Sequence, residues 1–263
     1  MASVLPPRRD IEYPDSDGQP MAETPQHRDN MINTIVALKL WFAADPMVYV
    51  SGNMFVYYAE GDRHQHVSPD VFAVRGIPKL PERRSYRVWE EGKAPEMVIE
   101  FTSESTRGED IEDKFWIYRE KLKVSEYFLF DPFEEYLEPS LQGHRLVRGQ
   151  WVPIKPVRGR VPSKVLGLHL ERSGEDLRLY DPSNGSWLPL AVEEHELRER
   201  AEAELRHAEG ARRQAEEARR QAEGRAQQAT TELEWLRRQL EELQRWGTPE
   251  PQPRPRRRKR KDT

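Results

Sequence analysis

Apolar residues recur with helical and then strand-like spacing along the first 130 positions. Thr24-Pro25 is typical of a helix start, and Met31, Ile35, Leu38 and Phe42 then follow on one helical face, which predicts a helix ending before Pro46. Strands are predicted at residues 47–50, 54–58, 70–74, 96–102 and 126–130, with a second helix from near residue 105 to about 122. This order predicts an α/β fold with a mixed sheet.

Two β-hairpins are predicted in the next segment. One lies at 141–154 around Arg148-Gly149, and the other at 177–190 around Asn184-Gly185. We expect these hairpins to extend or flank the sheet.

The region from residue 191 to 246 has the pattern of a coiled-coil helix. ARRQAEE at 211–217 is followed by ARRQAEG at 218–224, and the leucines from Leu233 to Leu243 alternate by three and four residues. Upstream, the corresponding positions are mostly alanine, whose side chain buries less apolar area than leucine does. We therefore expect the helix to be more loosely packed there. The segment 247–263 is rich in proline and arginine and is expected to be disordered.

Composition indicates the domain organisation of the chain and its cellular location. We expect a disordered leader at 1–20, a globular domain at 21–190, the coiled-coil helix at 191–246 and a basic tail at 247–263. The chain lacks cysteine, which excludes disulfides, thiolate metal sites and cysteine nucleophiles. It has no apolar run long enough for a membrane span, so a cytoplasmic protein is expected.

The net charge argues against a protein that binds nucleic acid through a basic surface over its whole length. The formal net charge is −4, and only the tail is strongly basic. Contact with a phosphate polymer would therefore rely on the tail or on local groups such as Arg83, Arg84 and Arg87. The tail could equally serve solubility alone.

Two carboxylates stand in otherwise apolar strands. Asp70 lies in SPDVFAV and Glu100 in MVIEFTSEST. Strand alternation places Met97, Ile99 and Phe101 on one side and Glu100 on the other. Taken singly, Glu100 could lie on a solvated sheet face, and Pro69-Asp70 could be turn chemistry.

Together, the two carboxylates suit a hard divalent cation. Asp and Glu oxygens are ligands of Mg²⁺ or Mn²⁺, which can activate water for phosphodiester hydrolysis. Lys114, in EDIEDKFWIY, could orient that water or stabilise the transition state, although a solvated helix lysine is the simpler interpretation.

Five segments of the chain agree in order and spacing with one protein family. They are SPDVFAV, VWEEGKAPEMVIEFTSESTR, EDKFWIYREKLKVSEYFLFDP, YLEPSLQGHRL and VLGLHLE. Over residues 21–190 the chain resembles the Uma2 family of endonucleases, of the PD-(D/E)XK nuclease superfamily. The resemblance implies a restriction-endonuclease-like core, with helices flanking a mixed sheet.

The resemblance also implies roles for individual residues. Asp70 and Glu100 would be metal ligands, with Mg²⁺ or Mn²⁺ as cofactor. The superfamily lysine is expected two positions after Glu100, where this chain has Thr102; Lys114 matches the lysine that Uma2-like sequences supply from the following helix. Glu23 resembles an additional acidic ligand, or alternatively balances the helix dipole.

Several neighbouring polar residues remain ambiguous. His27 could line the same pocket or be incidental. Ser103, Ser105 and Thr106 fit a capping loop better than a nucleophile, and Glu104 replaces a proline common in related sequences. Asp110 and Asp113 flank Lys114, although Asp113 should face elsewhere on the helix.

Two functions are compatible with the sequence. The first is a metal-dependent endonuclease that acts on nucleic acid, with DNA as the expected substrate. The alternative is a weakly active or inactive binding module that contacts nucleic acid through its tail. In either case the coiled coil would join copies of the chain or bind a partner protein.

Overall fold

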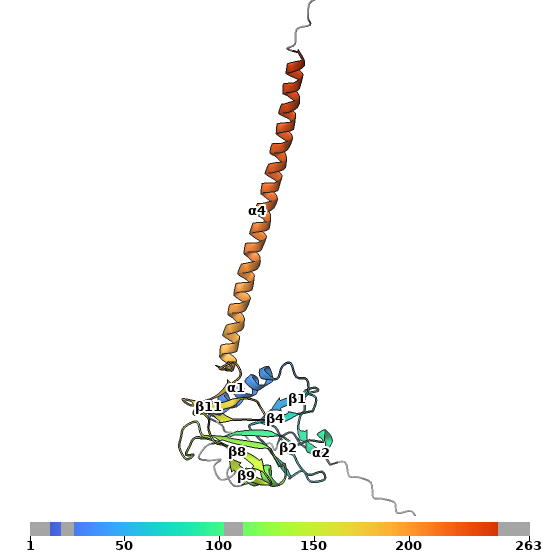
Figure 1. Ribbon diagram of the computed structural model, residues 1–263. Helices are drawn as coiled ribbons and strands as arrows, with labels where there is room; N and C mark the ends of the chain where they lie inside the picture. Colours follow the sequence, from blue (N-terminus) through green and yellow to red (C-terminus); the bar gives the residue numbers. More distant parts are fainter. Residues whose placement is uncertain (1–10, 17–23, 103–112, 247–263) are drawn as a thin grey trace, which may run out of the picture. The chain divides into compact units, whose positions relative to one another are not determined.

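The computed structural model describes residues 11–16, 24–102 and 113–246. The chain divides into two compact units, Met1–Glu196 and Leu197–Thr263, and each is considered separately below. Figure 1 shows the elements, several of them labelled. In the described part, no helix is both long and apolar enough to cross a membrane.

The first unit contains a six-stranded mixed sheet with the order β1-β4-β6-β7-β8-β9. All neighbours in this sheet are antiparallel except β6 and β7, which are parallel. Its strands are β1 (Val48–Ser51), β4 (Val71–Arg75), β6 (Met97–Phe101), β7 (Glu126–Phe130), β8 (Leu141–Val147) and β9 (Gln150–Pro153). The predicted mixed sheet is confirmed.

Two smaller sheets accompany the six-stranded sheet. One is antiparallel, with β10 (Val161–Pro162), β11 (His169–Ser173), β12 (Asp176–Asp181) and β13 (Ser186–Trp187) in sequence order. The other has the order β3-β2-β5, from β2 (Val56–Tyr57), β3 (His66–Val67) and β5 (Tyr86–Arg87). The strand predicted at 54–58 therefore belongs to this small sheet and not to the six-stranded one.

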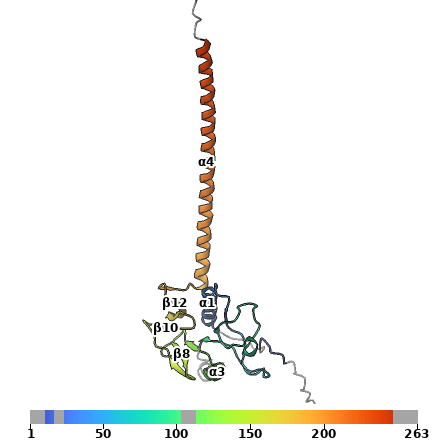
Figure 2. The same ribbon diagram turned by 45° about the vertical axis from the view of Figure 1, so that its right-hand side comes forward.

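The helices of the first unit are short except for the first. They are α1 (Pro25–Trp41), α2 (Val88–Glu91) and α3 (Lys114–Glu120), and Figure 2 shows α1 and α3 in a turned view. The predicted N-cap of α1 is confirmed, because the Thr24 side chain accepts a hydrogen bond from the His27 backbone N–H at 3.2 Å. The start predicted for the second helix lies outside the described residues.

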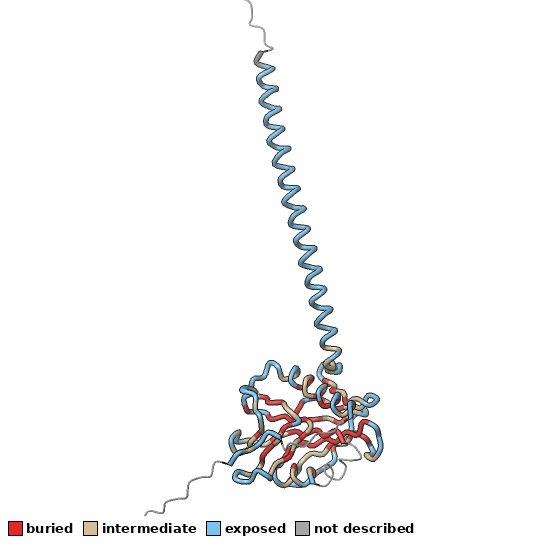
Figure 3. Tube along the Cα trace, turned by 180° about the vertical axis from the view of Figure 1, so that it is seen from behind, coloured by how far each residue is buried: buried red, intermediate tan, exposed pale blue. Residues whose placement is uncertain are grey.

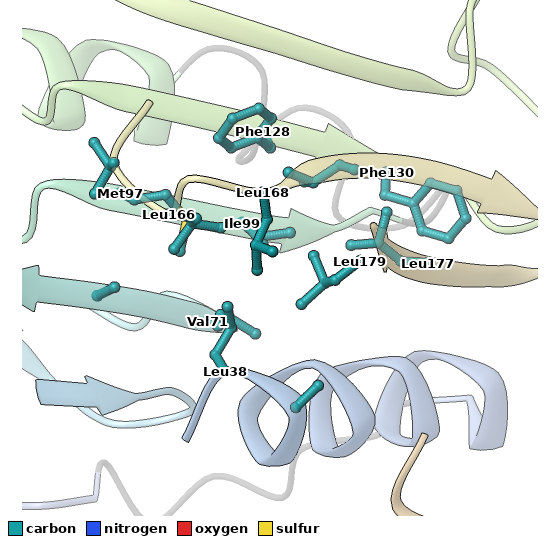
Figure 4. Packing of buried hydrophobic residues seen from close by; sticks show 14 of the residues in the cluster. Leu38, Val71, Met97, Ile99, Phe128, Phe130, Leu166, Leu168, Leu177 and Leu179 are labelled. Atoms are coloured by element: carbon teal, nitrogen blue, oxygen red, sulfur yellow. The ribbon is translucent and has the colours of Figure 1, made fainter. Parts of the chain in front are cut away.

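Strand alternation divides the apolar core between the two faces of the six-stranded sheet. In β6, Met97, Ile99 and Phe101 join one cluster, in which Leu38 of α1 and Leu177 of β12 also pack. Figure 4 shows this cluster between the sheet, α1 and the second sheet. Val98 joins a second cluster, which contains Tyr118 of α3. The predicted facing of β6 is confirmed.

Both predicted hairpins are present. β8 and β9 pair around Arg148 and Gly149, whose φ angles of 51° and 77° suit a tight two-residue turn. β12 and β13 pair around Gly185. The first hairpin extends the six-stranded sheet, whereas the second belongs to the four-stranded sheet.

The leader is not structureless throughout. The Tyr13 ring lies 5.1 Å from the rings of Tyr57 and Trp89, and Asp15 forms an ion pair with Arg84 at 2.6 Å. The Tyr57 hydroxyl also donates to the Pro14 carbonyl at 2.6 Å. The expectation of disorder over 1–20 is therefore wrong for residues 11–16, because aromatic packing and ion pairing anchor them.

One long helix, α4, spans Ala191–Trp246, the range over which the sequence predicts helix. At 1.5 Å per residue it is about 84 Å long. Residues 195–244 are all exposed, as Figure 3 shows. Ion pairs one turn apart support the helix internally, for example Arg219 with Glu223 at 2.9 Å. Pairing with another helix stays a prediction.

A half-buried histidine packs beside the second cluster, against Phe115. The His144 ring packs edge-on against Phe115 at 5.2 Å, and its Nδ1 atom has no hydrogen-bond partner. Burial lowers the pKa of His144 below its ordinary value of 6.5.

Stability is therefore expected to fall as the pH drops below about 6.5, because the unfolded chain then binds a proton that folded His144 resists. His144→Phe should reduce this acid-side loss, which denaturant unfolding at pH 5 to 7.5 would measure. An unchanged slope between pH 5 and 6.5 in the variant would contradict this origin.

Candidate active site

The two candidate carboxylates lie opposite each other, with Glu100 in β6 and Asp70 directly before β4. β4 and β6 pair with Val71 opposite Ile99, and the next pair in this register is Asp70 and Glu100. The Asp70 backbone N–H lies 3.4 Å from Glu100 Oε2, and Asp70 Oδ2 accepts a hydrogen bond of 2.7 Å from the Phe101 N–H. The structure therefore brings these predicted site residues together.

Glu100 is fully buried, with 0% of its surface exposed. Interpreting it as part of a solvated sheet face is therefore wrong. A buried carboxylate is costly unless charged or hydrogen-bonding groups compensate for the lost water. Two groups from α3 do so in this structure.

Those two groups are Lys114 and Tyr118. Lys114 Nζ lies 3.0 Å from Glu100 Oε2, and the Tyr118 hydroxyl donates to Oε1 at 2.5 Å. Only 12% of the Lys114 side chain is exposed, so it is not an ordinary solvated helix lysine. Because the two residues are four positions apart, both side chains lie on one face of the helix.

Tyr118 holds its proton firmly. Burial, and then the adjacent Glu100 carboxylate, raise the pKa of Tyr118 well above its ordinary value. The phenol therefore remains a hydrogen-bond donor. The sequence analysis assigned Tyr118 no role, although its spacing from Lys114 was a usable signal.

Aromatic packing holds α3 against the sheet. The Tyr118 ring lies 5.0 Å from that of Tyr127 in β7, and the Trp151 indole N–H donates to the Phe115 carbonyl at 3.0 Å. α3 carries both partners of Glu100, so its docking also positions the site.

His27 approaches Asp70 from the first turn of α1. Its Nε2 atom lies 3.3 Å from Asp70 Oδ1, and its ring lies edge-on to that of Phe101 at 5.9 Å. Both side chains of the contact are nearly buried, at 13% and 14% exposed. The N-cap by Thr24 fixes the turn that carries this histidine. The structure therefore brings His27 next to the candidate site residue Asp70.

The backbone around Asp70 is closely supported by the turn that follows β1. The Asn53 N–H donates to the Pro69 carbonyl at 2.8 Å. A Cβ atom at Gly52 would lie 1.9 Å from the Asp70 carbonyl oxygen, so only glycine fits there.

The remaining sequence candidates fall into two groups. Asp113 is exposed, as expected for the neighbour of Lys114, and Thr102 is buried with its hydroxyl 3.5 Å from the Phe130 carbonyl. Glu23, Ser103, Glu104, Ser105, Thr106 and Asp110 lie outside the described residues.

The carboxylates fit a divalent cation by donor chemistry. Each ionised carboxylate offers about four acceptor positions, and carboxylate oxygens are among the ligands that Mg²⁺ and Mn²⁺ prefer. Among residues 11–16, 24–102 and 113–246, no cluster of three acidic or histidine side chains forms a complete metal cage. Mg²⁺ commonly needs only one or two carboxylates, because water and phosphate supply its other ligands.

The predicted local basic group is already paired with acidic side chains. Arg83 contacts Glu91 at 2.6 Å, Arg87 contacts Glu90 at 2.9 Å, and Arg84 contacts Asp15. These arginines therefore do not form the uncompensated positive surface that the sequence suggested.

Comparison with known proteins identifies the family. The model of the Uma2 family, described as "Putative restriction endonuclease", matches residues 3–203. The chain belongs to the Uma2 family. Its fold is accordingly restriction-endonuclease-like, and the family is one of nucleases.

A solved structure is also similar. It is a "putative nuclease belonging to DUF820" from Anabaena variabilis ATCC 29413, with 13% identity and a TM-score of 0.42, covering 58% of this chain and 80% of that chain. No curated protein matches this Uma2 chain significantly.

Replacing Lys114 should destabilise the Uma2 domain. Lys114→Met removes the opposite charge from the buried Glu100 carboxylate, at an expected cost of about 3–5 kcal/mol in the free energy of unfolding. The double variant Glu100→Gln/Lys114→Met should recover part of this loss. Denaturant titration would measure both effects.

Lys93→Met is the matched control, because Lys93 pairs with Glu96 at 3.3 Å but is 40% exposed. Its expected effect is within about 1 kcal/mol. Equal losses in the two single variants would contradict a special dependence of Glu100 on Lys114.

Proposed function

We propose that this protein is a Mg²⁺- or Mn²⁺-dependent endonuclease that hydrolyses phosphodiester bonds of nucleic acid, with DNA as the expected substrate. The observation that supports it best is the convergence of Asp70, which directly precedes β4, with Glu100 of β6 and Lys114 of α3. Membership of the Uma2 family supports the same reaction class.

Asp70 and Glu100 would hold the cation. A bound Mg²⁺ or Mn²⁺ would supply Lewis acidity at the scissile phosphate and lower the pKa of an attacking water. Glu23 remains a third proposed ligand by resemblance. His27 and the Phe101 N–H orient Asp70, whereas Tyr118 and Lys114 orient Glu100.

Lys114 is the group proposed to act on the reacting atoms. Its ammonium lies 3.0 Å from Glu100 Oε2, where it can orient the nucleophilic water or stabilise negative charge that develops on the phosphate. Water attacks phosphorus and gives up a proton, the phosphorus–oxygen bond to the leaving group breaks, and the leaving oxygen takes up a proton. The reaction needs no redox partner.

Nucleic acid is negatively charged, and the globular part of the chain is acidic, so substrate binding needs another source of positive charge. The arginines at 83, 84 and 87 are paired with carboxylates, so the basic segment 247–263 is the proposed source of phosphate contacts. This segment has seven lysines and arginines against two acidic residues.

Metal binding tests the carboxylate pair directly. Titration calorimetry with Mg²⁺ or Mn²⁺ should show binding to the wild type and its loss in Asp70→Asn and Glu100→Gln, because each variant removes a ligand charge. Glu126→Gln is the matched control, since Glu126 is a buried carboxylate of β7 that pairs with Arg145 at 2.6 Å. Equal binding in all four proteins would contradict the site.

Nuclease activity tests the chemistry. With Mg²⁺ or Mn²⁺, the wild type should cleave at least one of plasmid DNA, single-stranded DNA and RNA, and a chelator should abolish cleavage. Lys114→Met should lower the rate by roughly 10²–10³-fold, as loss of a transition-state contact does. Lys93→Met should cleave like the wild type.

The inactive binding module is the alternative outcome. Metal binding without cleavage of any substrate, or cleavage unaffected by Lys114→Met in folded protein, would favour that function over the endonuclease.

A further inference from the structure

A continuous seam of small and apolar side chains runs along α4 within the second unit. We call it the α4 seam. It comprises Ala208, Ala211, Ala215, Ala218, Ala222, Ala226, Ala229, Leu233, Leu236, Leu240 and Leu243. The four leucines are 60%, 46%, 57% and 71% exposed, in that order. Leucines at this spacing are typical of a surface that another helix covers.

We propose that the α4 seam binds the same seam of a second copy of this chain, as a parallel two-stranded coiled coil. Leu233 and Leu240 occupy the a positions of the heptad, and Leu236 and Leu243 occupy the d positions. Two-fold pairing is the commonest closed assembly, and it makes one surface complementary to itself. The proposal is independent of the endonuclease activity.

Charges beside the leucines favour the parallel orientation. In this register Glu232 lies at g and Arg237 lies at the following e position. Parallel helices bring each g residue next to the e residue five positions later on the other helix. Glu232 would therefore meet the partner's Arg237, and two-fold symmetry makes this contact twice.

The antiparallel arrangement is less favourable. Overlapping all four leucines would then place Leu233 opposite the partner's Leu243 and bring e positions beside e positions. Arg237 would lie beside the partner's Arg237, and this like-charge contact costs energy. Electrostatic complementarity therefore selects one orientation.

Pairing should be strongest at the leucine end. Leucine buries more apolar area than alanine, so the layers from Leu233 to Leu243 contribute most. Between Ala218 and Ala226 the seam takes two consecutive four-residue steps, a local departure from the heptad that changes the supercoil. Intrahelical ion pairs such as Arg220 with Glu216, at 3.2 Å, support the helix in this weaker half.

Cysteine cross-linking tests the orientation in the full-length chain, which has no cysteine of its own. Parallel pairing places residue 236 opposite its own counterpart, so Leu236→Cys should form a disulfide-linked dimer under mild oxidation. Arg238→Cys, on the outer f position, is the matched control and should stay unlinked. Linkage only in a mixture of Leu236→Cys and Leu240→Cys proteins would show antiparallel pairing and overturn the proposal.

Charge exchange tests the register by sedimentation equilibrium. The wild type should have twice the chain mass of 30.9 kDa. Glu232→Arg and Arg237→Glu should each weaken the dimer about tenfold, because each creates a like-charge contact twice. The double variant should restore dimerisation, which separates pairing from loss of helix. A monomeric wild type at tens of micromolar, or no restoration in the double variant, would overturn the proposal.

Discussion

Compensation of the buried Glu100 charge is the interaction on which the site depends. The carboxylate lies in a strand whose other residues form the apolar core, and it is fully buried there. Lys114 supplies the opposite charge and Tyr118 a hydrogen bond, both from α3. A helix formed after β6 in the chain thus completes a site that begins within the sheet.

A second buried glutamate shows why one charged residue in a strand is weak evidence for chemistry. Glu126 of β7 is 1% exposed and lies in a strand as apolar as β6. Its carboxylate is bound by Arg145 of β8, and by the Ser163 hydroxyl and the Lys164 N–H, which directly follow β10. Glu100 differs because a second carboxylate lies beside it.

Local rules predicted much of the fold and the main site residues. The Thr24 cap, the two hairpins and the facing of β6 follow from short-range preferences, and the structure has each of them. The proximity of Asp70, Glu100 and Lys114 was accessible because alternation and the family pattern agree. Their catalytic roles stay predictions.

The parts that sequence reasoning missed depend on contacts distant in the chain. The separate small sheets and the anchoring of Tyr13 have no signature in local spacing. The arginines at 83, 84 and 87 look like a basic patch in one dimension, but folding pairs them with acidic neighbours. Tertiary packing decides such features.

The shortness of α3 has a consequence for how the protein would fail under stress. This seven-residue helix depends on rings of the β7 and β9 strands to stay docked. Isolated helices of this length do not persist in water. Detachment of α3 would remove the Lys114 amine and the Tyr118 phenol from Glu100 together, while most of the strand pairing survived. The candidate site would then be lost in a chain whose sheet is still folded.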